Sequence, residues 1–270
     1  MAGAAGDAAL WEPNHPYVAH VDLLLKRLPA AWHGTRIVQL SDFHYDPYFS
    51  VHPVRKGVEI VRALHPDLIV FTGDFITDHG NAPFVGRKQQ LQNLDACAAL
   101  LGSLQCRLGS VAVLGNHDVG FDADAVMSAL QAHGVPVLRN ASHPLEQNGS
   151  RLWLVGVDDV LAGSPDLEKA LTGVPKDEPV ILLAHEPDFA LQSVRYGVDL
   201  QLSGHSHGGQ IRIPLLGPIY LPELAHKFPK GFYRVGDMQL YTNVGLGTIN
   251  VPLRFDCRPE VTVFTLRSGV

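Results

Sequence analysis

The sequence predicts an α/β fold in which two mixed β-sheets pack as a sandwich flanked by helices. In the first half of the chain, short apolar runs alternate with helical patterns, whereas β-like segments dominate the second half. The 270 residues are 46% apolar and 18% charged, so they can bury a large core, and no stretch has the composition of an interdomain linker. We therefore expect a single domain over residues 13–270, after an Ala/Gly-rich, disordered start over residues 1–12.

Five short runs rich in β-branched residues predict buried strands. Each run is followed within two residues by a Gly, Asp, Asn or His, where a strand would open into a loop. In open α/β sheets the loops beyond the carboxyl ends of the strands converge on one crevice, so residues far apart in sequence can meet there. The runs are residues 36–40, 67–71, 110–114, 180–184 and 198–202.

Helical periodicity and later β-like segments complete the expected order of elements. The helices are predicted at residues 54–64, 89–101, 123–133 and 165–171. The later strands are predicted at residues 151–157, 210–213, 232–235, 239–242 and 260–266.

Five motifs after the buried strands contain oxygen and imidazole groups that suit two metal ions. Asp42 lies two residues before His44, and His205 two before His207; in an extended segment each pair points to one side. The two carboxylate oxygens of Asp74 can reach two cations, and imidazoles favour Mn, Fe or Zn over Mg or Ca. The motifs are Ser41-Asp42-Phe43-His44, Gly73-Asp74, Gly115-Asn116-His117-Asp118, His185 and Gly204-His205-Ser206-His207.

Each motif residue taken alone has an ordinary structural interpretation. An Asp at a strand end is usually a turn or helix-cap residue, and a single buried histidine such as His185 is more often a hydrogen-bonded core residue than a ligand. The combination points the other way, because five motifs stand in order, each after a strand-like run. A mixed nitrogen and oxygen set also differs from a purely structural zinc site.

This order of motifs resembles the calcineurin-like metallophosphoesterases, over residues 41–207. Gly204 to Gln210, Gly245-Leu246-Gly247 and the Pro252 to Glu260 segment further resemble a bacterial branch with YkuE- and YaeI-like phosphodiesterases and UDP-2,3-diacylglucosamine pyrophosphatases. The resemblance implies the same sandwich fold and a dinuclear site. In that site Asp42, His44 and His207 hold one metal, Asp74 bridges, and Asn116, His185 and His205 complete the second.

The resemblance also implies a mechanism. In this mechanism a hydroxide held between two metal ions would attack phosphorus. The expected metals are Mn, Fe or Zn, with Mg, Ni or Co as alternatives. His117 assists the leaving oxygen, and we expect Asp118 to accept a hydrogen bond from His117. The expected activity is hydrolysis of phosphodiester or pyrophosphate bonds. Two alternatives stay open: a phosphomonoesterase or phosphoprotein phosphatase, and a non-catalytic binding protein on the same fold.

The net charge and one apolar segment indicate which binding partners to expect. A net charge of −6 provides no electrostatic footprint for nucleic acid. Residues 213–222 are rich in proline and apolar side chains, and they predict either an arm packed on the core or an apolar rim for a lipid or membrane-surface substrate. The expected substrate is a small-molecule or lipid-linked phosphoester. The rim would comprise Leu215, Leu216, Ile219 and Tyr220.

The cysteine pattern and the hydropathy of the sequence indicate the cellular location to expect. Three cysteines without CxxC spacing predict no disulfide framework, and neither a transmembrane run nor a signal peptide is evident. We expect a cytoplasmic protein with peripheral membrane contact, with a trimmed N-terminal anchor as an alternative. The oligomeric state is not predicted.

Overall fold

The computed structural model describes residues 6–78 and 85–269. Its helices are α2 (Val51–Leu64), α3 (Arg87–Gly102), α4 (Asn116–Ala132), α5 (Leu167–Ala170) and α6 (Ala190–Ser193). The strands are β1 (Tyr17–Leu25), β2 (Arg36–Leu40), β3 (Leu68–Thr72), β4 (Ser110–Val113), β5 (Ala141–Gln147), β6 (Ser150–Gly156), β7 (Val180–Leu183), β8 (Leu200–Ser203), β9 (Arg212–Ile213), β10 (Gly217–Pro218), β11 (Gly231–Val235), β12 (Met238–Thr242) and β13 (Glu260–Ser268).

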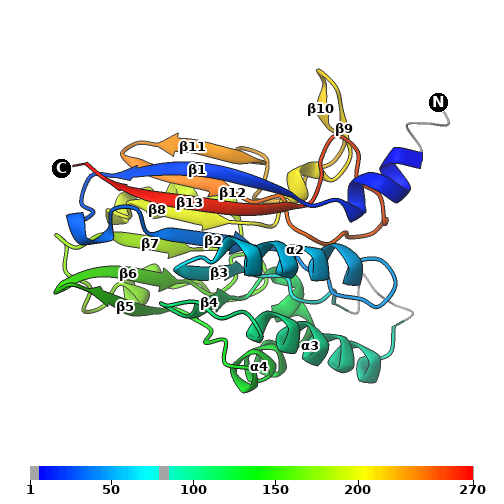
Figure 1. The fold of residues 1–270 in the computed structure, drawn as a ribbon, viewed down its shortest axis with the longest axis horizontal. Helices are drawn as coiled ribbons and strands as arrows, with labels where there is room; N and C mark the ends of the chain where they lie inside the picture. Colours follow the sequence, from blue (N-terminus) through cyan, green and yellow to red (C-terminus); the bar gives the residue numbers. More distant parts are fainter. Residues whose placement is uncertain (1–5, 79–84, 270) are drawn as a thin grey trace.

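Two mixed sheets form the centre of the molecule (Figure 1). The five-stranded sheet has the order β1-β13-β2-β3-β4, and the six-stranded sheet has the order β11-β12-β8-β7-β6-β5. Strands β2, β3 and β4 are parallel to one another, and so are β6, β7, β8 and β12. The parallel groups bring several strand ends of like polarity to the same region, as a site built from strand-end loops requires.

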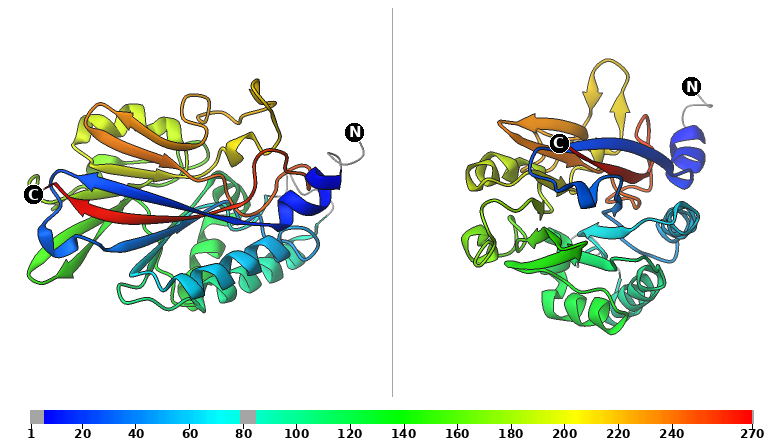
Figure 2. Two further views of the ribbon diagram at one scale, coloured as in Figure 1. Left: turned by 45° about the horizontal axis from the view of Figure 1, so that its top comes forward. Right: turned by 60° about the vertical axis from the view of Figure 1, so that its left-hand side comes forward.

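Side-chain alternation along the strands builds four layers. In β2, Ile37 belongs to the apolar core shared by the two sheets, whereas its neighbour Val38 packs with the helix-covered core of α2, α3 and α4. A third core, which includes Leu182 of β7 and Leu167 of α5, covers the outer face of the six-stranded sheet. The helices flanking the sheets are visible in Figure 2. The predicted fold class is therefore confirmed.

The differences from prediction lie mainly at exposed edges. Strands β1 and β5 were not predicted because their half-exposed sequences alternate with polar residues such as His20, Asp22 and Glu146. Helix α2 begins three residues before the predicted start because Pro53 is tolerated in the first turn. The predicted helix at 123–133 matches the part of α4 that follows a non-helical residue, Asp122.

The start of the chain also differs from prediction. Two short helical turns, Asp7–Trp11 and Glu12–Asn14, occupy part of the segment expected to be disordered. The Glu12 carboxylate accepts hydrogen bonds from the backbone N–H groups of Asp256 and Cys257, which explains the order in this segment. The expectation for residues 1–5 lies outside the described residues. No helix among the described residues is long and apolar enough to cross a membrane.

Candidate metal centre

The structure brings all nine predicted catalytic and metal-ligating residues into one cluster. They lie in the loops after β2, β3, β7 and β8 and in the first turn of α4, which follows β4. Three overlapping groups of carboxylate and imidazole atoms have every ligand atom within 4.8 Å of the others. These groups are Asp42, His44 and His207; His44, Asp74 and His117; and Asp74, His185 and His205. The predicted convergence of distant strand ends is confirmed.

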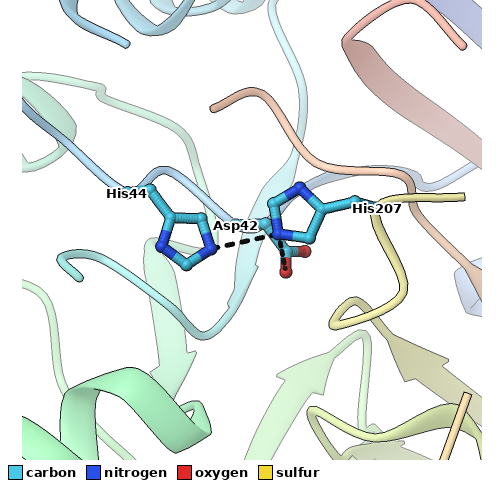
Figure 3. A group of neighbouring side chains, drawn as sticks. All are labelled: Asp42, His44 and His207. Carbon is cyan, nitrogen blue, oxygen red and sulfur yellow. Dashed lines mark hydrogen bonds and ion pairs between the residues drawn. The ribbon is translucent and has the colours of Figure 1, made fainter. Parts of the chain in front are cut away.

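The first half of the cluster consists of Asp42, His44 and His207 (Figure 3). The Nε2 atoms of His44 and His207 face each other at 3.0 Å, and His207 Nε2 lies 3.4 Å from Asp42 Oδ1. All three side chains are buried. Burial lowers the pKa of His44 to about 3 and also lowers the pKa of His207, so both rings are neutral. Two neutral imidazoles that face one carboxylate form a donor set suited to a cation.

The second half of the cluster is arranged around Asp74. Its Oδ2 atom lies 3.1 Å from His185 Nε2 and 3.5 Å from His44 Nε2, so Asp74 connects both halves. The other carboxylate oxygen accepts a hydrogen bond from the backbone N–H of His117. Nδ1 of His205 lies 3.0 Å from Asn116 Oδ1, which places the amide oxygen beside an imidazole of this half.

Backbone carbonyls fix which nitrogen of two imidazoles faces the cluster. Thr72 O lies 2.5 Å from His185 Nδ1, and Glu223 O lies 2.8 Å from His205 Nε2. Since a carbonyl only accepts, these nitrogens donate, and His185 Nε2 and His205 Nδ1 face the oxygen atoms of Asp74 and Asn116. The buried His185 Nε2 lies 3.1 Å from Asp74 Oδ2 but without the geometry of a hydrogen bond. The residues present therefore fit metal ions.

Electrostatics favour positive charge at the same place. Burial disfavours the charged form of His185, but the Asp74 carboxylate beside it raises the pKa of His185 well above its usual value. Burial likewise opposes ionisation of Asp74, yet His185 keeps the pKa of that carboxyl well below its usual range. A cation bound between these two side chains would take the place of the proton. Burial raises the pKa of Asp42 to about 6, so this carboxyl also gains from a nearby cation.

Five of the cluster residues have left-handed backbone conformations. The φ angles are 49° at Asp42, 39° at His44, 58° at Asp74, 67° at His205 and 48° at His207. Such conformations cost a non-glycine residue roughly 1–3 kcal/mol each, and strain of this kind concentrates at functional sites. Sequence spacing suggested extended segments, but the turned backbone is what aims these side chains at a common centre.

The surroundings of His117 correct one prediction. His117 Nδ1 lies 2.5 Å from Asp78 Oδ2, so the partner of this imidazole is Asp78 and the expected bond to Asp118 is wrong. Asp118 instead accepts hydrogen bonds from the backbone N–H groups of Asp74, Phe75 and Gly115. The side chain of Asp118 points back into the loop because the first turn of α4 begins at Asn116. Asp118 is thus a residue that joins the β3 and β4 loops.

Sequence reasoning did not single out Asp78 or the role of Arg254. The available signal for Asp78 was an acidic residue four positions after Asp74 in the same loop. The fully buried guanidinium of Arg254 donates to the carbonyl oxygens of Val244, Gly247 and Cys257. The loop held in this way donates from Gly247 N to Asp42 O at 2.7 Å. Arg254 therefore stabilises the loop that contacts the backbone of Asp42.

Two cavities open beside the cluster. One of about 420 Å³ is lined by Asp74, Asn116, His117 and His205, together with Ile219 and Tyr220 of the predicted apolar rim. The other, of about 250 Å³, includes His44 and Thr77 in its lining, and both cavities share residues 249–251. Leu215 and Leu216 do not line either cavity but form part of the turn between β9 and β10.

The match to known sequences agrees with this geometry. Residues 35–209, more than half of the chain, match the family of calcineurin-like phosphoesterases. The chain belongs to this family. It is 38% identical over 268 residues to the uncharacterized metallophosphoesterase YkuE of Bacillus subtilis, which covers 98% of the chain and 91% of YkuE. These matches confirm the family predicted from the motifs.

Further relatives support the predicted bacterial branch. The phosphodiesterase YaeI of Escherichia coli is 30% identical over 86% of the chain and 82% of its own length. The UDP-2,3-diacylglucosamine pyrophosphatase LpxG of Chlamydia trachomatis is 29% identical over 93% of the chain and 89% of its own length. The solved NAD nucleotidase of Haemophilus influenzae has a TM-score of 0.51 at 16% identity, over 79% of the chain and 45% of that structure, and shares the fold.

Proposed function

We propose that this family member is a dinuclear metal-dependent hydrolase of phosphodiester or pyrophosphate bonds. The observation that supports this most directly is the cluster in which Asp74 connects two groups of buried ligands. Asp42, His44 and His207 would hold one ion, and Asn116, His185 and His205 the other, with Asp74 between them. Bound ions would polarise the phosphate and acidify a water molecule.

His117 supplies proton transfer in this proposal. Its Nδ1 is held by Asp78, so Nε2 is the atom left to donate a proton to the leaving oxygen. Burial lowers the pKa of His117, but the nearby Asp74 and Asp78 carboxylates outweigh it and raise this pKa above its usual value. A raised pKa favours the protonated form that a general acid needs. Because His117 lines the larger cavity, a leaving group there lies within its reach.

The cavities favour a diester over a monoester. A diester has a substituent on each side of phosphorus, and two cavities adjoin the cluster, with residues 249–251 in the lining of both. Neither cavity has a lysine or arginine among its described lining residues. A monoester dianion would gain more from such cations than a diester does, because it has more negative charge. The lining therefore supports a diester or pyrophosphate substrate.

The apolar side of the larger cavity favours a substrate with an apolar group. Ile219 and Tyr220 line this cavity together with the cluster residues, and the relative LpxG is named for a substrate that has acyl chains. We propose that a lipid-linked phosphoester places its apolar part against this wall. Comparing kcat/KM for an acylated diester with that for the matching water-soluble diester tests this, and equal values would exclude it.

An activity panel tests the proposed reaction. The metal-loaded protein should hydrolyse bis-p-nitrophenyl phosphate faster than p-nitrophenyl phosphate or a phosphopeptide. A preference for either monoester would instead support a phosphomonoesterase or phosphoprotein phosphatase. Full metal loading without turnover of any substrate would support the non-catalytic alternative. Elemental analysis of the active protein identifies the metal, for which the imidazole-rich ligand set favours Mn, Fe or Zn.

We also propose a cytoplasmic location with peripheral membrane contact. Cys97, Cys106 and Cys257 are all free, as is usual in a reducing compartment. Cell fractionation tests this proposal, and recovery of the protein in an extracytoplasmic fraction would contradict it.

A further inference from the structure

The hairpin formed by β9 and β10 exposes an unusual number of large apolar side chains. Leu215 is fully exposed, Leu216 is 81% exposed, and Ile213, Ile219 and Tyr220 are between 44% and 68% exposed. The hairpin projects from the body of the molecule in Figures 1 and 2. Exposed apolar residues are ordinary when scattered singly, but a contiguous group on a projecting element indicates a contact surface.

The base of the hairpin is fixed to the metal centre. Arg212 donates from its guanidinium to the carbonyl oxygen of Gly208, the residue after the cluster residue His207. Backbone bonds from Phe255 to Gln210 and from Arg212 to Phe255 attach the base to a second segment. The tip, residues 214–216, therefore has a defined position relative to the cavity that contains the predicted ligands.

The N-terminal turn adds a second apolar group at the same base. Leu10 is 74% exposed and Trp11 is 46% exposed. The backbone of Arg254 donates to Ala8 O, and its neighbour Phe255 pairs with the hairpin base, so one short segment connects the two features. Figure 1 shows the N-terminal turn beside the hairpin. Aliphatic residues thus lie at the hairpin tip, whereas the amphipathic aromatic residues Trp11 and Tyr220 lie away from the tip.

The shape and charge of this surface determine what it can contact. Strands β9 and β10 have two residues each, which is too short to pair with an added strand. A projecting three-residue turn does not provide the roughly 800 Å² per partner of a stable protein interface. Residues 211–222 contain one arginine and none of the chain's 27 acidic residues, although the chain has a net charge of −6. A tip of this composition can enter an apolar layer, whether the surface above that layer is uncharged or anionic.

We propose that the β9–β10 hairpin docks on a phospholipid bilayer by inserting Leu215 and Leu216 into its apolar layer. Tyr220 and Trp11 then lie at the depth of the headgroups, where amphipathic aromatic rings are most stable. Since Ile219 and Tyr220 also line the larger cavity, docking places the mouth of that cavity at the lipid surface. This surface does not depend on the proposed reaction, and it can be tested without turnover.

Vesicle sedimentation with the full chain tests the proposal. The probe is vesicles of phosphatidylethanolamine and phosphatidylglycerol, at low and at high salt. The test variant changes Leu215→Ser and Leu216→Ser together, and Leu24→Ser, at a 55% exposed position in β1, is the matched control. Wild type should bind at both salt concentrations, because apolar insertion is not screened. The double variant should lose at least about tenfold in partition coefficient, given about 0.8 kcal/mol per buried methylene, while the control retains it.

A second variant retains the apolar tip. Leu215→Trp should place an indole in the bilayer, and brominated lipids should quench its fluorescence above the level of wild type. Circular dichroism and the urea midpoint confirm that each variant is folded. Absence of vesicle binding by wild type, binding lost at high salt, or equal binding by the double variant each overturns the proposal. Concentration-dependent dimers that the double variant abolishes without vesicles also overturn it, because they make the hairpin a contact between copies of the chain.

Discussion

Replacing Gly73 by alanine should disturb the metal centre more than the fold. Gly73 precedes Asp74 and has φ of 95°, in the region that favours glycine. A Cβ atom there would lie 2.6 Å from the backbone N of Gly115 and 2.7 Å from His185 Nδ1. His185 Nδ1 is the atom that donates to Thr72 O, so the clash would also move the imidazole that faces Asp74.

Gly109 serves as a control that separates the cost of a left-handed backbone conformation from the cost of the steric clash. It has φ of 75°, but a Cβ atom at this position would have nothing within 4 Å. Gly109→Ala should therefore lower the free energy of unfolding by about 1–2 kcal/mol, the cost of a left-handed residue. Gly73→Ala should add an overpacking cost of about 1–3 kcal/mol, for a total of about 2–5 kcal/mol.

Urea unfolding and elemental analysis of the two variants measure these effects. We expect Gly109→Ala to retain the metal content of wild type, and Gly73→Ala to lose at least one metal equivalent even where it is folded. The reasoning is refuted if Gly73→Ala is destabilised no more than Gly109→Ala and retains its full metal content.

Three further predictions concern the cluster and His117. Asp74→Asn should lower the occupancy of both metals and abolish turnover, whereas Asn116→Ala should mainly weaken one metal; two full equivalents in active Asp74→Asn protein would remove Asp74 from the bridging role. His117→Gln should retain both metals but lose about 10²–10⁴ in rate, less for leaving groups of low pKa; an equal loss for every leaving group would contradict the acid role. Asp78→Asn should retain both metals and show the same leaving-group trend with a smaller loss, because Asp78 acts through His117; metal loss in this variant would make Asp78 part of the metal site.

The sequence by itself was sufficient for the fold class, the buried strands and the residues that meet in the candidate metal centre, but not for Asp78. Buried parallel strands are continuous apolar runs, so β2 is predicted to the residue, and the polar residue types after each run report where strand ends open into loops. Two edge strands, β1 and β5, were missed because they are half exposed and their polar alternation has no apolar run to detect, whereas the edge strand β4 was predicted from its apolar run. The family resemblance added the division of ligands into two sets.

Tertiary structure decided which groups meet and in which direction they point. His117 could pair with its neighbour Asp118 in the sequence, but the first turn of α4 directs Asp118 to backbone N–H groups and leaves Asp78 for the imidazole. The exposure of Leu215 and Leu216 likewise depends on how the short β9–β10 hairpin leaves the body of the molecule, which apolar composition alone does not specify. Composition and spacing determine which chemistry is available, whereas direction depends on backbone angles and long-range packing that no local pattern encodes.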